Sequence, residues 1–304
     1  MLTSLLSLYI ASVLQTELGP VQTGGTIGNN AAMVVTASAN LSDMLESGKK
    51  PIKDSVHISP IISAEGIIAV DIETEEILYE KNSHKRLKVA SITKLMTILI
   101  ILEENKLDEV VTVSNNAASI EGSTMFLRAG EQITIENLLY GALISSANDA
   151  AIALAEYNAG NVETFIIKMN KKAKELGMMN TNFSNPVGLD QPNNYSSAYD
   201  VAKLAAYLYH NKFVKKTAKI KELEVQSVSG DYKHKLETTN KLLHSYLKIN
   251  GLKTGKTDAA GLCLVAIAEN DQGHEIITVV LDSPARFEES KILIDWVFRA
   301  YNWQ

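Results

Sequence analysis

Strand-like segments on both sides of a long helical middle constrain the fold of this chain most strongly. Near the start, two largely apolar segments flank a polar turn and predict a β-hairpin. Because strands and helices occupy separate regions and do not alternate, we expect an α+β fold. The first hairpin should join the last strands in one antiparallel sheet, flanked by helices, with a helical lobe beside it and a cleft between the two. The predicted strands are 66–72, 76–82, 110–113, 222–228, 261–270 and 274–283.

The helical segments carry recognisable start and stop signals. The run 95–102 is apolar nearly all round, which is typical of a helix buried on most sides. Thr134 is a candidate cap for a helix over 134–144, a serine opens the segment 196–211, and two helices end at glycines. The further predicted helices are 148–160, 161–177 and 288–303.

Composition excludes some partners. The chain of 304 residues carries a net charge of −6 and no basic stripe, so we expect no nucleic-acid partner. Cys263 is the only cysteine in the sequence, and we interpret it as a small buried residue on a strand.

The segment 1–56 differs from the rest of the chain, and we expect the catalytic domain to cover 57–304. No Lys or Arg precedes Lys49. The apolar run 2–14 is shorter than a membrane-spanning helix, which needs about 20 residues. The small residues at 37–39 are a candidate cleavage site, and 40–55 form a polar linker. We expect either an N-terminal export signal or anchor, or a poorly ordered leader.

Ser91 and Lys94 stand three positions apart where the buried helix begins. Residues i and i+3 share a helix face, so the amine can reach the hydroxyl. A lysine in an apolar place has a lowered pKa, and its neutral amine can take the proton of a serine. The alternative is a serine cap beside a lysine that reaches solvent. The same spacing recurs at Ser47/Lys50 and Ser245/Lys248, but only Ser91 opens a buried helix.

Two further motifs follow in order. Ser146-Ala147-Asn148 lies between two predicted helices, where a capping turn is the alternative interpretation. Lys253-Thr254-Gly255 is otherwise an ordinary turn or strand end. Three such matches at element boundaries are more specific than any one of them.

Together these motifs resemble the active-site set of the penicillin-recognising serine enzymes. Within them the chain is most similar to the D-alanyl-D-alanine carboxypeptidases, or low-molecular-mass penicillin-binding proteins. The resemblance covers about residues 60–302 and includes ASITKLMT, SANDAA, GLKTGKTDAAG and RFEESKILIDWVF.

The resemblance implies a role for each matching residue. Ser91 would attack the carbonyl between two D-alanines of a peptidoglycan stem peptide and form an acyl-enzyme, which penicillin would also form. Backbone N–H groups of Ser91 and Lys256 would bind the oxyanion. Lys94 would accept the proton of Ser91, Ser146 would relay a proton to the leaving amine, and Asn148 would contact Lys94 and the substrate amide. Lys253 would supply positive charge, and Gly255 would let the substrate lie along the strand. Thr254 would bind the substrate carboxylate, which Arg286 would help to position.

The resemblance implies no cofactor or metal, an extracytoplasmic location, and β-lactam antibiotics as inhibitors. Related carboxypeptidases often carry a β-rich C-terminal domain and a membrane anchor, whereas this chain ends after the last predicted helix. We therefore expect membrane contact through the N-terminus only. Lys256 stands where histidine is common in the family, which leaves the substrate preference open, and Arg286 has a surface salt bridge as its alternative.

Other functions share parts of this pattern. A class A β-lactamase needs a glutamate in an E-x-x-L-N loop, and no glutamate between Asn148 and Lys253 begins one. A penicillin sensor would be acylated without turnover, and an endopeptidase that cuts cross-links would use the same residues. A metal or triad hydrolase lacks support, because H-E-x-x-H, H-x-x-E-H and G-x-S-x-G patterns are absent from the sequence.

Overall fold

The computed structural model describes residues 50–303. The predicted leader up to residue 49, the candidate cleavage site and residues 40–49 of the linker lie outside this part. Among the described residues, no helix is both long and apolar enough to cross a membrane.

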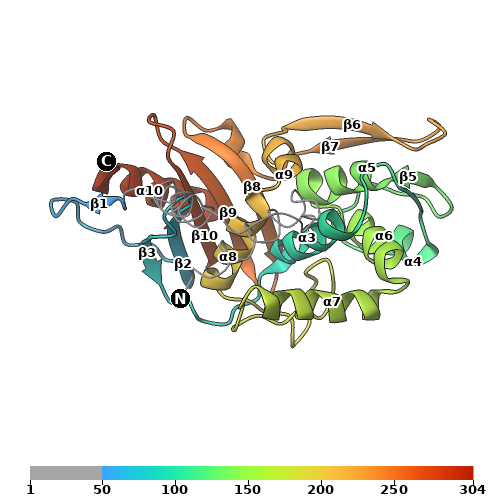
Figure 1. Cartoon of the computed structure of the whole chain (residues 1–304), viewed down its shortest axis with the longest axis horizontal. Helices are drawn as coiled ribbons and strands as arrows, with labels where there is room; N and C mark the ends of the chain where they lie inside the picture. Colours follow the sequence, from blue (N-terminus) through green and yellow to red (C-terminus); the bar gives the residue numbers. More distant parts are fainter. Residues whose placement is uncertain (1–49, 304) are drawn as a thin grey trace, which may run out of the picture.

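A five-stranded antiparallel sheet forms one side of the molecule (Figure 1). The strand order is β3-β2-β10-β9-β8, so the first hairpin lies beside the last strands as predicted. Strand β8, which carries the Lys-Thr-Gly motif, is at one edge of the sheet. The strands are β2 (Gly66–Asp71), β3 (Ile77–Lys81), β8 (Lys248–Thr257), β9 (Gly261–Glu269) and β10 (Glu275–Ser283).

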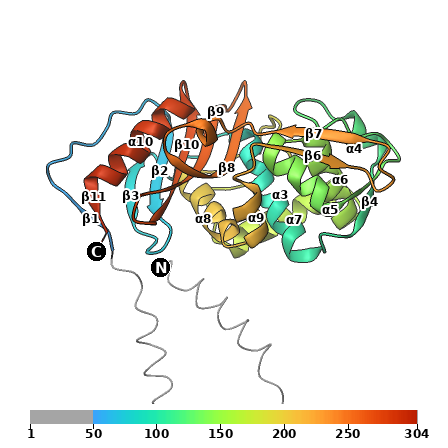
Figure 2. The ribbon, with the colours of Figure 1, turned by 90° about the horizontal axis from the view of Figure 1, so that it is seen from above.

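Alternation along the strands gives the sheet two apolar faces. Ile67 and Ala69 belong to a buried cluster with helix α10 (Arg286–Ala300), whereas Ile68 belongs to a second cluster on the helical-lobe side. Figure 2 shows α10 and α8 at the sheet, with the other helices beyond β8. Because both faces are covered, the central strands are almost continuously apolar.

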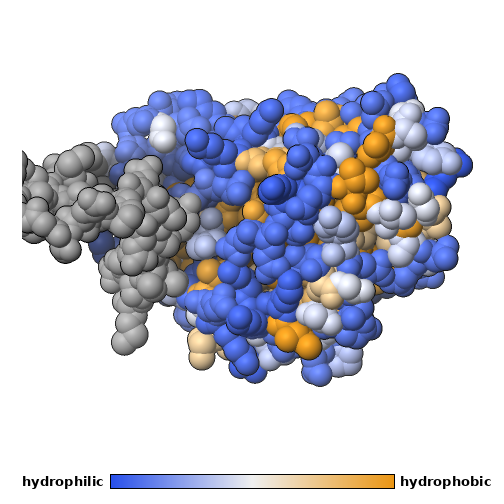
Figure 3. Space-filling view, turned by 45° about the vertical axis from the view of Figure 1, so that its right-hand side comes forward, coloured by the Kyte–Doolittle hydropathy of each residue, from blue (hydrophilic) through white to orange (hydrophobic). Residues whose placement is uncertain are grey.

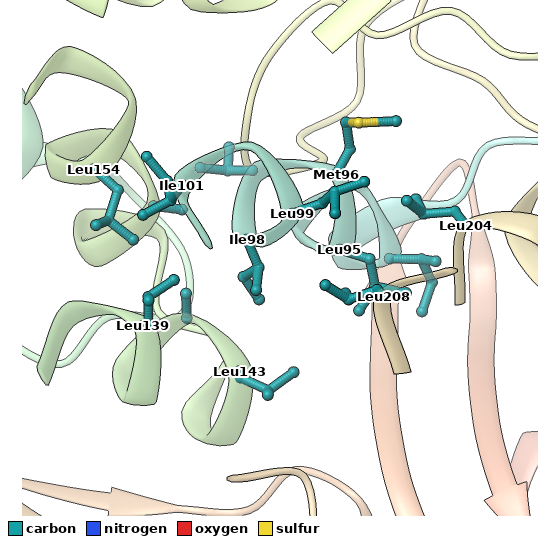
Figure 4. Packing of buried hydrophobic residues seen from close by; sticks show 14 of the residues in the cluster. Leu95, Met96, Ile98, Leu99, Ile101, Leu139, Leu143, Leu154, Leu204 and Leu208 are labelled. Carbon is teal, nitrogen blue, oxygen red and sulfur yellow. The ribbon is translucent and has the colours of Figure 1, made fainter. Parts of the chain in front are cut away.

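Helix α3 (Lys94–Glu104) lies at the centre of the helical lobe. Its residues from Lys94 to Ile101 are all buried, as the apolar run predicts. In Figure 4 its side chains point in several directions, toward Leu139 and Leu143, toward Leu154, and toward Leu204 and Leu208. The surrounding helices are α4 (Asn115–Ser119), α5 (Ile135–Tyr140), α6 (Asn148–Ala159), α7 (Val162–Glu175), α8 (Ala198–Tyr209) and α9 (Lys212–Thr217).

The helix ends follow from local chemistry. The Ser197 hydroxyl accepts from Asp200 N at the start of α8, and Thr134 does the same for Asn137 N at the start of α5, as side-chain caps do. Helix α6 ends at Gly160, which has a φ of 80°. Glycine is the usual residue at such a left-handed helix end.

Two predicted helices have bounds that differ from the sequence prediction. The expected helix 134–144 is divided into α5 and a π-helical turn, η2 (Gly141–Ser145), which stops at Ser146 in a left-handed conformation. The last helix starts earlier than predicted, at Arg286, and its final residues form strand β11 (Tyr301–Asn302).

Three two-stranded sheets complete the fold. Strand β1 (Ile52–Lys53) pairs with β11, so residues assigned to the linker already contact the end of the domain. The predicted segment 110–113 forms β4 (Val110–Thr112), which pairs with β5 (Gln132–Thr134). Strand β6 (Glu222–Gln226) pairs with β7 (Lys233–Glu237). The strands β5, β7 and β8 and the helices α4 and α9 were not predicted. On the face in Figure 3, hydrophobic residues form separate patches within a hydrophilic surface.

Candidate active site

Ser91 lies in a short 3-10 helix, η1 (Ala90–Thr93), immediately before α3. It therefore precedes the buried helix by one turn and is not its first residue. Ala90 has a φ of 47°, so the backbone turns sharply just before Ser91. Two glycines surround this turn. A Cβ on Gly188 would overlap Ala90 O, and a Cβ on Gly255 would lie 3.1 Å from Ser91 N.

Lys94 is fully buried, with its Nζ 2.9 Å from Ser91 Oγ. Nζ also lies 2.7 Å from Asn148 Oδ1 and 2.8 Å from Val187 O. Burial lowers the pKa of Lys94 well below its usual value, and the charge of Lys253 lowers it further, against an opposing effect of Asp149. The amine is therefore held beside the serine with its neutral form favoured, as a general base requires.

Ser146 and Asn148 come from the junction between η2 and α6. Asn148 Nδ2 donates to Glu121 O at 2.7 Å, so its Oδ1 faces Lys94. Ser146 has a φ of 63° and is 5% exposed. The structure thus places the Lys94 amine in contact with both Ser91 and Asn148. Ser146 lies two residues before Asn148, at the end of η2.

Lys253 and Thr254 lie buried on the edge strand β8. Lys253 Nζ donates to Thr254 O at 3.0 Å. Burial, and then the positive charge of Arg286, lower the pKa of Lys253 to about 7. The Thr254 hydroxyl is 2.6 Å from that of Thr239, which follows β7. This positive strand edge can receive an extended peptide that ends in a carboxylate.

Arg286 forms hydrogen bonds to the backbone and not the surface salt bridge that was its alternative. Its Nη1 donates to Gly255 O and, at 3.5 Å, to Cys263 O, which ties the start of α10 to β8 and β9. Lys256 is exposed and pairs with Leu262 across the β8–β9 ladder. Cys263 itself is buried on β9, as predicted.

The sequence stretch 175–190 also resembles the family, but no role was predicted for the loop within it that contacts the Lys94 amine. Asn185 Oδ1 accepts from the N–H groups of Val187, Gly188 and Leu189, and this arrangement directs Val187 O at the amine. Asp190 fastens the same loop to Thr257 Oγ1 at 2.7 Å, just beyond the Lys-Thr-Gly motif. A backbone carbonyl leaves no residue-type signature, although the stretch NPVGLD carries the asparagine and glycine that shape it.

A cavity of about 520 Å³ lies at the other end of α3, lined by Leu99, Leu102 and residues of α8 and the β2–β3 hairpin. The sequence-predicted site residues do not line it. In the described part of the chain, no group of three or more His, Cys, Asp or Glu residues is arranged to hold a metal ion.

Known proteins share this sequence and architecture. The D-alanyl-D-alanine carboxypeptidase DacF of Bacillus subtilis (strain 168) is 39% identical over 245 residues, 78% of this chain and 63% of that relative. DacC of Escherichia coli (strain K12), also a D-alanyl-D-alanine carboxypeptidase, is 37% identical over 259 residues, 80% of this chain and 63% of that relative. The chain thus spans less than two thirds of the length of these two relatives.

A solved structure agrees with the fold. The crystal structure of the Streptomyces K15 DD-transpeptidase is 32% identical and superposes with a TM-score of 0.75, covering 80% of this chain and 99% of that one. A family model described as D-alanyl-D-alanine carboxypeptidase matches residues 53–285, which include every candidate site residue except Arg286. This chain therefore belongs to the D-alanyl-D-alanine carboxypeptidase family.

Proposed function

We propose that this chain is a serine D-Ala-D-Ala carboxypeptidase that removes the terminal D-alanine from peptidoglycan stem peptides. The observation that carries the proposal is the buried Lys94 amine, 2.9 Å from the Ser91 hydroxyl. Its other two polar partners, Asn148 Oδ1 and Val187 O, carry no charge that would stabilise an ammonium. The stem peptide is the substrate, and β-lactams inhibit by acylating the same serine.

Acylation begins at Ser91. Its Oγ attacks the carbonyl carbon of the penultimate D-alanine while Lys94 Nζ accepts the hydroxyl proton. The N–H groups of Ser91 and Lys256 donate to the oxygen that becomes negative. When the intermediate collapses, the C–N bond breaks and Lys94 returns its proton through Ser146 to the leaving amine. Free D-alanine departs, and Lys94 is neutral again.

Water completes the reaction. It attacks the Ser91 ester and loses a proton to Lys94, and the shortened peptide leaves as a carboxylate while Ser91 regains its proton. Before acylation, Lys253 and Thr254 bind the C-terminal carboxylate of the peptide, and Arg286 supports β8 through Gly255 O. Asn148 holds Lys94 and contacts the substrate amide.

The surroundings favour a long-lived penicillin adduct over β-lactamase activity. The six glutamates between the second and third motifs lie on α6, α7 and the β6–β7 hairpin. They are Glu156, Glu163, Glu175, Glu222, Glu224 and Glu237. The hydrogen-bond partners of Lys94 are instead Ser91, Asn148 and Val187. None of the six is therefore placed beside Lys94 to activate water against a penicilloyl ester.

Peptidoglycan is extracytoplasmic, and we therefore propose that the protein acts outside the cytoplasmic membrane, secreted or held through its N-terminus. Membrane contact through the segment before residue 57 is part of this proposal, as is the division into a leader (1–56) and a catalytic domain (57–304).

Labelling of the purified protein with a fluorescent penicillin tests the proposal, with Ser91→Ala as control. We expect a stable adduct in the wild type, none in Ser91→Ala, and release of D-alanine from a stem pentapeptide by the wild type alone. An adduct that persists in Ser91→Ala would overturn the assignment of the nucleophile. An adduct without D-alanine release would indicate a sensor, and rapid loss of the adduct would indicate a β-lactamase.

A further inference from the structure

Phe126 combines two unfavourable properties. It has a φ of 64°, and its side chain is 82% exposed. This left-handed conformation is an outlier for an aromatic residue. Its neighbours Met125 and Leu127 are buried at 3% and 4% exposure. The ring therefore contributes little to the core, and the backbone conformation that directs it outward must be imposed by its surroundings.

Asp149 imposes that conformation from one side. Its carboxylate accepts from Met125 N at 3.1 Å and from Leu127 N at 3.0 Å, the two N–H groups that flank Phe126. Asp149 is 1% exposed, and a buried carboxylate is costly unless hydrogen bonds compensate. The buried Asp149 carboxylate therefore holds the backbone on both sides of the exposed Phe126.

His234 and Glu131 fix the same segment from the other side. His234 Nδ1 donates to Met125 O at 2.8 Å, and its Nε2 is 2.7 Å from Glu131 Oε1. The second carboxylate oxygen of Glu131 accepts from Arg128 N at 3.1 Å. Because the carbonyl oxygen only accepts, Nδ1 is the donor in the bond to Met125 O. We call Asp149, His234 and Glu131 the Phe126 clamp.

The clamped segment continues directly into the wall of the candidate active site. Asn148 N donates to Ser123 O at 2.6 Å, and Asn148 Nδ2 donates to Glu121 O. Phe126 follows Ser123 by three positions, so their Cα atoms are at most about 11 Å apart. The backbone that carries the exposed ring is therefore joined, within three residues, to the segment that contacts Asn148, the residue that holds Lys94.

We propose that Phe126 is a substrate-contacting residue that binds the aliphatic part of the peptide on the N-terminal side of the D-Ala-D-Ala unit. The inference rests on the proposed function and adds a subsite to it. An extended peptide spans about 3.3 Å per residue, so the two to four residues before the scissile bond cover about 7–13 Å. An exposed ring on a fixed backbone offers apolar area to such a peptide at little conformational cost.

The experiment compares two substrates of different length. One is N-acetyl-D-Ala-D-Ala, and the other is the pentapeptide L-Ala-γ-D-Glu-L-Lys-D-Ala-D-Ala. In Phe126→Ala we expect the ratio of kcat/KM for the pentapeptide to that for the dipeptide to fall about 10-fold, mainly through KM, because the ring would be buried by the longer peptide alone. Met179→Ala, which removes another exposed side chain (78%) far along the chain, should leave the ratio unchanged.

Phe126→Gly separates binding from folding. Glycine adopts a positive φ without strain, so this variant should lose the same ratio while its thermal midpoint stays equal or rises. An unchanged ratio in both variants, an equal loss on both substrates, or a lower thermal midpoint in Phe126→Gly would overturn the proposal. Failure of the proposed function would appear separately, as a wild-type protein that neither labels at Ser91 nor releases D-alanine.

Discussion

Lys94 Nζ and Asn148 Oδ1 lie 2.7 Å apart, and the asparagine amide has a single orientation because its Nδ2 donates to Glu121 O. A neutral oxygen thus occupies a position where a carboxylate would stabilise the ammonium form of Lys94. The pKa of Lys94, already lowered by burial and by Lys253, stays low as a result.

Asn148→Asp tests this relationship with almost no change in shape. The added negative charge raises the pKa of Lys94, so the amine is protonated at neutral pH and cannot accept the serine proton. We expect acylation by fluorescent penicillin at pH 7 to slow about 100-fold, within the range for a lost general base, and to recover partly at higher pH. Asn148→Ala is the control without the charge. An unchanged rate in Asn148→Asp would mean that Lys94 is not the base, and near-normal acylation in Lys94→Ala would lead to the same conclusion.

The pH dependence of acylation should be bell-shaped. Lys94 must be neutral, so the rate falls as pH drops through its lowered pKa. Lys253 must be charged, so the rate also falls as pH rises through its pKa of about 7. Arg286→Gln removes the positive neighbour that lowers the pKa of Lys253, and the alkaline limb should therefore move to higher pH. The pH profile of acylation by fluorescent penicillin checks this. If the alkaline limb does not move in Arg286→Gln, the limb does not report the deprotonation of Lys253.

Gly188→Ala should damage both stability and acylation. The new Cβ would overlap Ala90 O, and the residue has a φ of 90°. Gly130→Ala is a matched control, because its φ is 81° but nothing lies within 4 Å of the new Cβ. We expect a cost of about 1–2 kcal/mol in the control from backbone conformation alone. Gly188→Ala should cost several kcal/mol in denaturant unfolding and should slow acylation. Equal costs in the two variants would show that the contact with Ala90 relaxes freely.

Thr254→Val should weaken recognition of a free C-terminal carboxylate. The variant keeps the shape of the side chain but removes the hydroxyl that lies 2.6 Å from Thr239 Oγ1. A hydrogen bond to a charged group contributes about 1.5–3 kcal/mol, so kcat/KM for the pentapeptide should fall roughly 10- to 100-fold. A pentapeptide with an amidated C-terminus is the control substrate, and its turnover should fall much less. An unchanged preference between the two peptides would mean that the carboxylate binds elsewhere.

Much of the fold could be predicted because its signals are local. The hairpin over β2 and β3 follows from two apolar segments around a polar turn, α3 from one apolar run, and the cap at Ser197 from its residue type. The division at Gly141 was missed because a π-helical turn has the same apolar pattern as the helix it continues. Strand β7 was missed as well, since its alternation is short and its buried face rests on only two side chains, His234 and Leu236.

The candidate site could likewise be predicted only where local residue patterns mark it. Ser91, Lys94 and Asn148 were selected by the spacing of the motifs, and in the structure the Lys94 amine contacts both of the others. Val187 contributes only a carbonyl oxygen, and Thr239 is placed by tertiary pairing, so neither had a pattern to reveal it. Arg286 was expected to help position the substrate carboxylate, and this role stays a prediction. Its hydrogen bonds to the backbone carbonyls of β8 and β9 could not be predicted from the sequence.

The pairing of β1 with β11 has a mechanical consequence. Ile52 lies opposite Asn302 and Lys53 opposite Tyr301, so the two strands leave the domain from the same corner. Tension applied between those strands would break the backbone hydrogen bonds of this ladder one residue pair at a time and would not load all of them together. Tension between the two strands would therefore load this ladder first, at a corner formed by residues other than Lys253 and Thr254 on β8.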